Sequence, residues 1–273
     1  MRRFLLTTCL AAAAAAWACL AVPVASVGFS VGHAGPPPGA GFSYQIGGPF
    51  RPAPGVTVVD RDWHVAPAPG VYDICYVNAF QAQAGEHGWW RRRHPSLLLR
   101  RAGRPVVDRA WNEQLFDTSK AAKRRRLAAV IDRWIDHCAH VGYRAVEPDN
   151  LDSWTRSHGA LTVADNLAFA RLLIRHAHAD GLAIAQKNAA EIAARGRRLG
   201  FDFAIAEECQ TYRECDRYLH AYGDEVIEIE YTDAGLRNFE RACALRGTRI
   251  SIVYRDRNVT PAGRAGFVER RCE

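Results

Sequence analysis

Carboxylate side chains stand just after several short apolar runs of this 273-residue chain. Two carboxylates that face each other across a cleft can cleave a glycosidic bond, because one protonates the leaving oxygen while the other acts as base or nucleophile. Any single acid could instead form a salt bridge, but so many acids are hard to bury without partners. The candidate acids are Asp60, Glu147, Asp149, Asp152, Glu207, Glu208, Glu228, Glu230 and Asp233.

Amide, ammonium and phenol side chains occupy the same positions. Such groups can bind sugar hydroxyl or ammonium groups, and a lysine can orient a ring or steady a carboxylate. They are Gln45, Tyr76, Asn78, Asn150, Lys187, Asn188 and Tyr231. The sequence has no Gly-rich phosphate loop, no nucleophile-elbow serine and no Cys-x-x-Cys pair, so we expect neither a cofactor nor a metal site.

Short β-rich runs alternate with longer helical runs, which predicts a parallel sheet with crossover helices. A mature length of about 245 residues suits one barrel of roughly 250 residues. We therefore expect an α/β fold, a (β/α)₈ TIM-like barrel. Strands are expected over 42–46, 56–60, 71–77, 144–147, 182–186, 203–207, 226–230 and 250–254, and helices over 119–141, 162–180, 189–199 and 236–246.

The expected barrel places the polar residues at one mouth, because the active site of such barrels lies at the carboxyl ends of the strands. One link departs from the pattern. Only about nine residues, rich in Pro and Gly, join the first two strands, whereas a parallel crossover usually takes a dozen or more. The link is therefore a minimal crossover, or the barrel is irregular there. The long segment 79–116 is expected to contain a short helix near 86–93 and an active-site loop.

Residue alternation along the strands predicts which side chains face the barrel interior. In the fifth expected strand, large apolar residues alternate with alanine. If the bulky set packs under helices, Lys187 points inward. The same reasoning turns Glu208 inward in place of Glu207. It also turns inward Glu147, Asp149, Glu228 and Glu230.

The N-terminus has the layout of a secretory signal peptide, with Arg2 and Arg3 before an Ala/Leu-rich run and small residues at 24–26. The apolar run is short for a membrane anchor, so no span is expected. Cys19 could accept a lipid, but Ala16 stands where a branched aliphatic residue is expected. We expect residues 1–25 to be a signal peptide, 26–41 a flexible lead-in and 42–273 a single domain exported to the extracellular space or periplasm.

Six cysteines remain after the signal peptide, and an even number in an exported chain suggests disulfides. Cys209 and Cys215 are close in sequence, so we expect them to pair around a loop. Cys243 with Cys272 would fix the C-terminus. Cys75 and Cys138 are left over, as a third pair or as buried thiols.

The chain carries a formal net charge of +7. Its dense basic runs, Arg91–Arg93 and Lys123–Arg126, fall in expected helices and are interpreted as solvated faces. Nucleic-acid binding would require aromatic residues interleaved with basic ones along a groove, so we expect no nucleic-acid partner. A basic surface-binding protein is the least favoured alternative.

Several motifs occur in one order between about residues 42 and 256. They are Tyr44-Gln45, Cys75-Tyr76, Glu147-Pro148-Asp149-Asn150-Leu151-Asp152, Lys187-Asn188, Phe201-Asp202-Phe203, Glu207-Glu208-Cys209, Glu214-Cys215 and Glu230-Tyr231. Together they resemble glycoside hydrolase family 114, the endo-α-1,4-polygalactosaminidases. The resemblance implies a TIM-like barrel and a catalytic pair at Asp149 and Glu207, whereas alternation favours Glu208. The aliphatic-Asp pair of the family falls on Asp60 or Asp62.

The resemblance implies a secreted, endo-acting hydrolase of α-1,4-linked galactosamine polysaccharide, which we expect to be a monomer. A non-catalytic carbohydrate-binding barrel is the alternative, and it would be expected to lose one catalytic acid, whereas both are present here. The basic net charge conflicts with a cationic polymer, so carboxylates would have to dominate the cleft. The sequence leaves open whether the anomeric configuration is retained or inverted.

Overall fold

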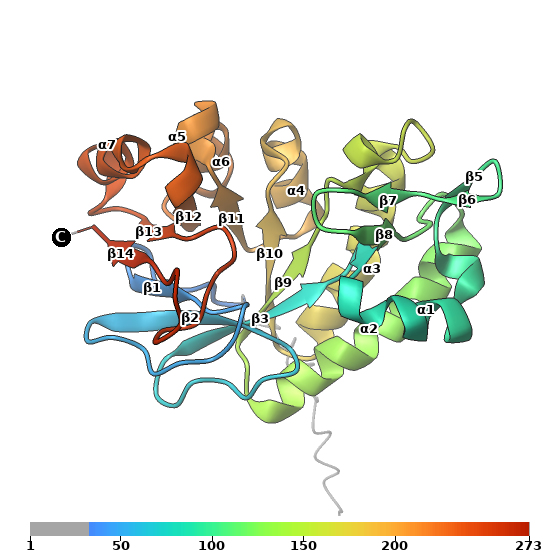
Figure 1. The fold of residues 1–273 in the computed structure, drawn as a ribbon, viewed down its shortest axis with the longest axis horizontal. Coiled ribbons are helices and arrows are strands. Elements are labelled where there is room, and N and C mark those ends of the chain that lie inside the picture. Colours follow the sequence, from blue (N-terminus) through green and yellow to red (C-terminus); the bar gives the residue numbers. More distant parts are fainter. Residues whose placement is uncertain (1–32, 273) are drawn as a thin grey trace, which may run out of the picture. The chain divides into compact units, whose positions relative to one another are not determined.

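Almost every residue of eight short segments is buried, as parallel strands covered on both faces require. The structure, a computed structural model, describes residues 33–272 (Figure 1), so the expected signal peptide and residues 26–32 of the lead-in lie outside the described residues. Each segment falls within two residues of an expected strand. They are β1 (Gly41–Tyr44), β2 (Val56–Asp62), β3 (Tyr72–Asn78), β9 (Ala145–Asp149), β10 (Ala183–Lys187), β11 (Phe203–Glu207), β12 (Val226–Tyr231) and β13 (Ser251–Arg255).

The parallel strands lie side by side in the order β1-β2-β3-β9-β10-β11-β12-β13. A further strand, β14 (Glu269–Arg271), pairs antiparallel with β13. The two ends of the parallel series lie next to each other, and Arg255 Nε on β13 donates to the Tyr44 carbonyl oxygen on β1 over 3.1 Å. The sheet therefore curls into a nearly closed barrel, as a TIM-like fold requires.

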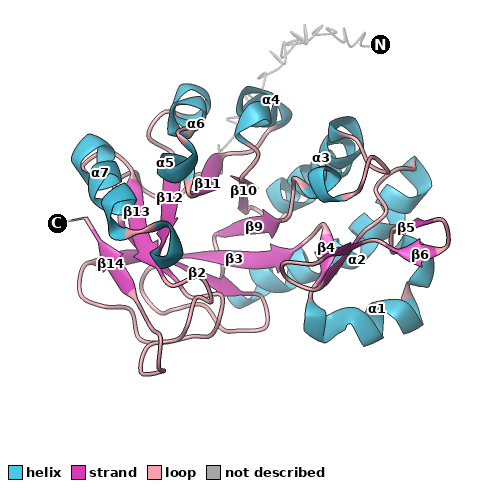
Figure 2. Ribbon diagram, turned by 45° about the horizontal axis from the view of Figure 1, so that its top comes forward, coloured by secondary structure: helices cyan, strands magenta, loops and turns pink. Residues whose placement is uncertain are grey.

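Helices cover the barrel on the side of strands β3 to β13 (Figure 2). Their buried residues recur at helical spacing, for example Leu127, Ile131 and Ile135. None of the helices in residues 33–272 is long and apolar enough to cross a membrane. The α-helices are α1 (His87–Arg93), α2 (Ala121–Val141), α3 (Val163–Ala179), α4 (Ala193–Leu199), α5 (Cys209–Tyr212), α6 (Cys215–Tyr222) and α7 (Leu236–Arg246). The 3₁₀ helices are η1 (Ala84–Glu86), η2 (Pro95–Leu97), η3 (Ser153–Arg156), η4 (Ala190–Ile192) and η5 (Thr232–Ala234).

The link between β1 and β2 is a minimal crossover, because residues 45–55 contain no helix and still return the chain to a parallel strand. The barrel is also irregular there, with a register shift between Gly41 and Phe42. A Cβ atom at Gly41 would lie 2.0 Å from the Gly55 carbonyl oxygen, so only glycine fits. Both alternatives left open by the sequence therefore occur together.

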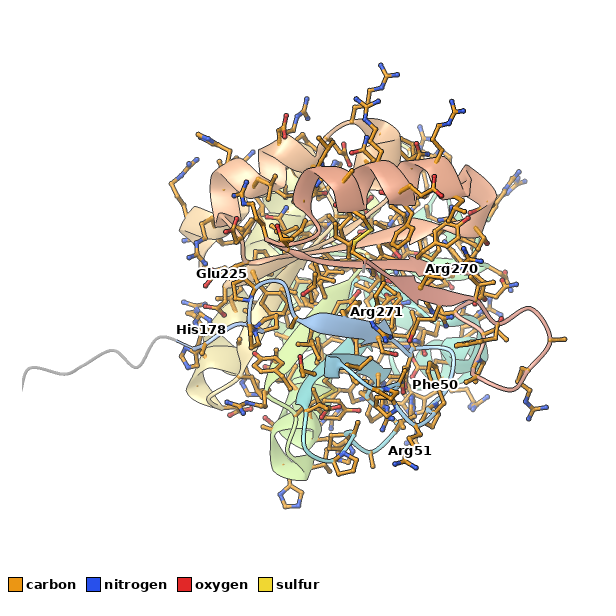
Figure 3. All side chains as sticks on the ribbon, turned by 90° about the vertical axis from the view of Figure 1, so that its left-hand side faces the viewer. Phe50, Arg51, His178, Glu225, Arg270 and Arg271 are labelled. Atoms are coloured by element: carbon orange, nitrogen blue, oxygen red, sulfur yellow. A yellow bond between two sulfur atoms is a disulfide. The ribbon has the colours of Figure 1, made fainter. Side chains whose placement is uncertain are left out.

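Arg61 stabilises the two links that lack helices. Its guanidinium donates to the Phe50 carbonyl over 2.8 Å in the β1–β2 link and to the Ala66 carbonyl over 3.0 Å in the β2–β3 link. Phe50 and Arg51 lie on the same side of the molecule as Arg270 and Arg271 of β14 (Figure 3). Charged hydrogen bonds to backbone carbonyls thus replace the covering helices on this side.

The first described residues contact the barrel. The Tyr72 hydroxyl donates to the Ala34 carbonyl over 2.8 Å, and the His33 ring stacks on His178 with 4.3 Å between ring centroids. A Cβ atom added at Gly35 would lie 3.5 Å from the Cβ atom of Phe203, so the backbone of Gly35 lies close to β11. These contacts bring residues 33–40, which the composition assigns to a flexible lead-in, against the barrel.

An inserted segment between β3 and α2 forms two small antiparallel sheets at the carboxyl end of β3. It contains the predicted short helix as α1 (His87–Arg93). One sheet has three strands in the order β4-β8-β7, and the other is the hairpin β5–β6. The strands are β4 (Gln81–Ala82), β5 (Arg100–Arg101), β6 (Arg104–Pro105), β7 (Val107–Asp108) and β8 (Glu113–Leu115).

All six cysteines after the expected signal peptide form disulfides. Cys209–Cys215 and Cys243–Cys272 are the two predicted pairs, with S–S distances of 2.07 and 2.08 Å. Cys75 on β3 pairs with Cys138 on α2, which resolves the pairing that the sequence leaves open.

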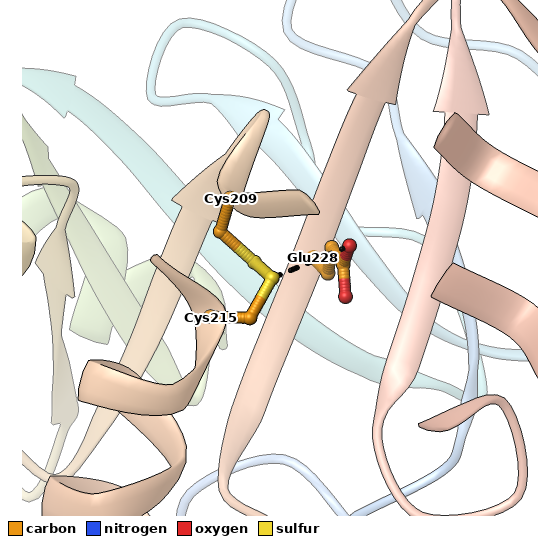
Figure 4. A group of neighbouring side chains, drawn as sticks. All are labelled: Cys209, Cys215 and Glu228. Atoms are coloured by element: carbon orange, nitrogen blue, oxygen red, sulfur yellow. Dashed lines mark hydrogen bonds between the residues drawn. A yellow bond between two sulfur atoms is a disulfide. The ribbon is translucent and has the colours of Figure 1, made fainter. Parts of the chain in front are cut away.

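Cys209 and Cys215 lie beside Glu228, a set of groups that could suggest a metal site (Figure 4). Both sulfurs are already bonded to each other, so no thiolate is available as a ligand. The contact of 3.7 Å between Cys215 Sγ and Glu228 Oε1 is a sulfur–oxygen contact, because a disulfide sulfur has no proton to donate.

The barrel interior is an apolar cluster that takes side chains from every parallel strand and from none of the helices. On β9 and β10 it contains the small residues Ala145, Ala183 and Ala185, as alternation predicts. On β11 and β12 it contains the large residues Phe203, Ile205, Ile227 and Ile229. Large and small residues must alternate around the barrel to fill it, so a rule that sends every large residue outward is wrong for these two strands.

Candidate active site

A cleft opens at the carboxyl ends of the strands, where the polar residues were expected to meet. The inserted β7–β8 hairpin and the loop after β13 border it. The lining residues are Tyr44, Ile46, Gly47, Tyr76, Gln83, Asp108, Trp111, Glu113, Asp149, Asn150, Asp152, Arg156, Lys187, Asn188, Glu207, Tyr231, Arg257, Asn258 and Val259.

Lys187, the last residue of β10, lies at the floor of the cleft and is only 2% exposed. Its Nζ is 3.3 Å from Asp149 Oδ1 and 3.5 Å from Glu207 Oε2, and it also pairs with Glu147 Oε1. Burial lowers the pKa of Lys187, but the three carboxylates outweigh it and hold the pKa well above the ordinary value. The lysine therefore remains an ammonium group that connects three strands.

Asp149, at the end of β9, accepts hydrogen bonds from two neighbours besides Lys187. The Tyr76 hydroxyl donates to Oδ2 over 2.8 Å, and Asn150 Nδ2 donates to the same oxygen over 3.2 Å. Burial raises the pKa of Asp149, but Lys187 and these donors outweigh it, so the pKa lies below its ordinary value. Asp149 is thus a carboxylate at neutral pH.

Glu207, at the end of β11, faces Asp149 across the Lys187 ammonium group. Its Oε1 accepts a hydrogen bond from the Tyr231 hydroxyl, and its Oε2 accepts one from Asn188 Nδ2 over 2.8 Å. The Glu207 backbone N–H donates to Asn188 Oδ1 over 2.9 Å. These contacts hold the carboxylate toward the cleft.

The strand ends that carry these groups turn through left-handed backbone. The φ angles are 65° at Asn150, 51° at Asn188 and 57° at Glu208. Asparagine adopts this conformation more easily than most residues, whereas glutamate rarely does. The turn at Glu208 directs its side chain to Arg257 Nη2 at 2.8 Å, so it is Glu207 that lies in the cleft.

The cleft is acidic although the chain is basic overall. Its acidic lining residues are Asp108, Glu113, Asp149, Asp152 and Glu207, and its basic ones are Arg156, Lys187 and Arg257. Arg156 is itself paired with Asp108 at 2.9 Å and with Asp152 at 2.8 Å. Carboxylates therefore dominate the charge that a ligand in the cleft would meet.

Several predicted binding residues lie behind the lining. Asn78 donates to Glu113 Oε2 over 2.8 Å, and Glu147 is buried beneath Lys187. Asp60 is fully buried, and Gln45 is fully buried and accepts a hydrogen bond from Arg61 over 2.9 Å. These residues can support the site but cannot touch a ligand in the cleft.

Other predicted residues point away from the cleft. Glu228, expected to face inward, instead pairs with Arg246 of α7 at 3.0 Å. Glu230 accepts hydrogen bonds from the Gln210 backbone N–H over 2.9 Å and from the Thr211 hydroxyl over 2.7 Å, both on α5. Alternation was wrong for both glutamates because the isoleucines beside them fill the barrel interior. Asp233, like Glu208, pairs with Arg257.

Three residues of the cleft that the sequence reasoning missed, Asp108, Trp111 and Glu113, come from the inserted hairpin. Trp111 is 52% exposed and lines the cleft, as does Glu113 two residues later. The sequence signal was an aromatic residue and an acid close together in a segment too long for a simple connection. Gln83, Arg156 and Arg257 were also missed.

The model of one family, glycoside hydrolase family GH114, matches residues 28–273. The chain belongs to this family. It is therefore a glycosidase. No curated protein sequence matches the chain significantly.

Solved structures share the GH114 fold of this chain. Ega3 from Aspergillus fumigatus in complex with galactosamine superposes with a TM-score of 0.69 at 21% identity, covering 86% of this chain and 96% of that one. The glycoside hydrolase domain of PelA from Pseudomonas aeruginosa superposes with a TM-score of 0.55 at 15% identity, covering 84% and 99%. These likenesses confirm the TIM-like barrel.

Proposed function

We propose that this GH114 protein is a secreted, endo-acting hydrolase of α-1,4-linked galactosamine polysaccharide, with Asp149 and Glu207 as its catalytic pair. The observation that carries the proposal is the position of these two carboxylates on either side of Lys187 in an acidic cleft. The structural likeness to Ega3 in complex with galactosamine supports an amino sugar as the substrate unit. At neutral pH the ammonium groups of such a polymer are attracted to the acidic lining.

The environments of the two carboxylates suggest different roles. Asp149 is held ionised by Lys187 and Tyr76, which suits the nucleophile that attacks the anomeric carbon. Glu207 then serves as the acid that protonates the leaving oxygen and as the base that activates water. Lys187 lies between the two carboxylates and pairs with both. Its ion pair with Asp149 weakens when the Asp149 oxygen bonds to the anomeric carbon, because the carboxylate then loses its negative charge.

The spacing of the pair favours retention of the anomeric configuration. Because Asp149 Oδ1 and Glu207 Oε2 lie within 3.5 Å of the same nitrogen, these oxygens cannot be more than about 7 Å apart. Retaining enzymes place their carboxylates at ~5–5.5 Å and inverting enzymes at ~6.5–9.5 Å. The retaining range lies well inside the limit, whereas most of the inverting range lies beyond it.

The inserted hairpin supplies groups suited to binding an amino sugar. The exposed face of Trp111 can stack on a sugar ring and attract an ammonium group. Glu113 Oε2 accepts hydrogen bonds from Asn78 and Asn150, beside Asp149. We assign Glu113 to a substrate ammonium group. Tyr76, Asn150, Asp152, Asn188 and Tyr231, which also line the cleft, would contact the sugar or hold the catalytic pair.

The three disulfides fit a protein that works outside the cytoplasm. We propose that residues 1–25 are removed on export and that the rest acts as one monomeric domain. A fusion of residues 1–41 to a reporter enzyme that is active only after export tests the targeting. Sedimentation of the mature protein tests the oligomeric state.

The experiment that tests the activity incubates the mature protein with α-1,4-linked galactosamine polymers of graded acetylation. Mass spectrometry of the products should show internal cleavage into oligomers of several lengths, and NMR of freshly formed reducing ends should show the α-anomer first. Release of monomers only would contradict endo action. Binding without cleavage would instead support a carbohydrate-binding barrel.

A further inference from the structure

The Asp60 carboxyl on β2 is fully buried beneath the cleft. Among residues 33–272, no side-chain or backbone donor reaches either of its oxygens. An ionised carboxylate without a donor is costly to bury, because nothing replaces the water it loses. Protonation removes this cost, and the neutral acid then has one hydrogen of its own to donate.

Glu147 on β9 has one carboxylate oxygen that lacks a hydrogen-bond donor. Its Oε1 accepts a hydrogen bond from the Tyr44 hydroxyl over 3.1 Å and pairs with Lys187. Its Oε2 is buried and accepts none from the described residues. Tyr44 places the two carboxyl groups in one buried layer, because it lies opposite Asp60 in the β1–β2 register and its hydroxyl donates to Glu147. Glu147 accordingly raises the pKa of Asp60. A single proton between Asp60 and Glu147 Oε2 would give each group the partner it lacks.

We propose that Asp60 is a positioning residue that stays protonated in the folded protein and donates its proton to Glu147 Oε2. Glu147 is thereby fixed with both oxygens engaged, and it presents a single negative charge to Lys187. The ion pair between Glu147 and Lys187 fixes the position of the Lys187 ammonium group relative to Asp149 and Glu207. The catalytic consequence rests on the proposed function, whereas the shared proton does not.

The proton belongs on Asp60 because of what surrounds each group. Glu147 has an ammonium group and a phenol as donors, and Asp60 has neither. Burial raises the pKa of Asp60, as do Glu147 and Asp149, and only Lys187 opposes them. Tyr143 also responds to the charge of Asp60, and its hydroxyl donates to the Val65 carbonyl over 2.8 Å.

Infrared difference spectroscopy tests the proton directly. The wild-type minus Asp60→Asn difference spectrum, recorded at pH 9 where Glu113 and Glu228 are ionised, should show the C=O stretch of a buried protonated carboxyl. Asp62→Asn is the matched control on the same strand, because Asp62 is hydrogen-bonded to His64 and Gln83. The band should remain in this control. Absence of the band from the wild type, or its loss in the control instead, would overturn the proposal.

The positioning role is tested by comparing a conservative and a truncating substitution. Asparagine can donate to Glu147 as the protonated acid does, whereas alanine leaves Glu147 Oε2 without a partner. We expect kcat of Asp60→Ala to fall about ten- to hundredfold below that of Asp60→Asn, with KM nearly the same. Equal losses in the two variants would contradict the role.

Two outcomes separate this inference from the proposed function. If the wild type cleaves no galactosamine polymer, the proposed function fails while the infrared band still decides the protonation of Asp60. If Asp60→Ala does not fold, Asp60→Asn still tests the role. Asparagine should then preserve kcat to within about tenfold of the wild type, and a larger loss would mean that the acid itself takes part.

Discussion

Asn188 holds Glu207 at two points. The Asn188 Nδ2 atom donates to Glu207 Oε2 over 2.8 Å, and Asn188 Oδ1 accepts from the Glu207 backbone N–H over 2.9 Å. The end of β10 thereby fixes both the backbone and the carboxylate at the end of β11. The pairing works because Asn188 sits in left-handed backbone, with φ of 51°, which turns its amide toward the neighbouring strand.

Removing this amide should slow the reaction without abolishing substrate binding. We expect Asn188→Gly to lower kcat at least about tenfold while KM changes little, because Glu207 loses its orientation but stays in place. Glycine tolerates the left-handed backbone, so the variant removes the side chain without adding strain. Steady-state kinetics on galactosamine polymer measures the effect. An equal change in KM and kcat would indicate a binding role instead.

Loss of either catalytic carboxylate should nearly abolish cleavage. We expect Asp149→Asn and Glu207→Gln each to lower kcat by at least ~10²–10⁴. Glu208→Gln should cost less, because Glu208 does not itself line the cleft and is paired with Arg257. Glu225→Gln is the matched control, because Glu225 is a half-buried glutamate that pairs with Arg197 and does not line the cleft. Near-normal turnover of Glu207→Gln with loss in Glu208→Gln would reverse the assignment.

Glu113 should make the stability of the protein depend on pH. Burial, together with Asp149 and Asp108, raises the pKa of Glu113 to about 7, although the hydrogen bond from Asn78 lowers it. The folded state therefore binds this proton more tightly than the unfolded chain. The resulting stability is full below pH ~4 and is lost as pH rises from ~4 to ~7.

Glu113→Gln should accordingly raise the melting temperature at pH 8 and change it less at pH 4, as calorimetry can measure. The same variant should raise KM more for a fully deacetylated polymer than for a partly acetylated one, because the carboxylate that meets an ammonium group is gone. If both polymers respond alike, Glu113 does not recognise the ammonium group.

Trp111 should contribute to substrate binding more than to the chemical step. We expect Trp111→Ala to raise KM for long polymers about tenfold, since an aromatic face that stacks on a ring or attracts a cation contributes on the order of 1 kcal/mol or more. Tyr212→Ala is the control, because Tyr212 is 65% exposed on α5 and does not line the cleft. Similar kinetics in both variants would remove Trp111 from the binding site.

The Cys75–Cys138 disulfide should stabilise the fold more than Cys209–Cys215. The two bonds close segments with sequence separations of 63 and 6, which correspond to about 4 and about 2 kcal/mol of lost chain entropy in the unfolded state. Paired Cys→Ala variants compared by urea unfolding should show this order. The reverse order would mean that native contacts near Cys209 outweigh chain entropy.

The sequence by itself determined the order of the strands and the position of the proposed catalytic pair along them. Each expected strand is a short run with several apolar residues, and this local pattern suffices because parallel strands are buried on both faces. The Glu-Pro-Asp-Asn block placed Asp149, and the motif after Phe203 placed Glu207, at strand ends that the barrel brings to one mouth.

Only the tertiary structure decided which way several side chains face. Phe203 and Ile227 fill the barrel interior beside the small residues of β10, and no single strand reveals this arrangement because it depends on the space that the other strands leave. Glu228 is therefore directed outward to Arg246. At Glu208 the left-handed backbone breaks the alternation altogether.

Contacts between distant segments were likewise beyond the sequence. Cys75 and Cys138 pair because α2 packs on β3, and Trp111 reaches the cleft because the inserted hairpin stands at the end of that strand. Asp60 was expected to bind substrate, but the structure buries it fully, and no donor among the described residues reaches its oxygens. Residue types show what chemistry is available, whereas burial and neighbouring charges decide which acid is ionised, which is neutral and which can reach a ligand.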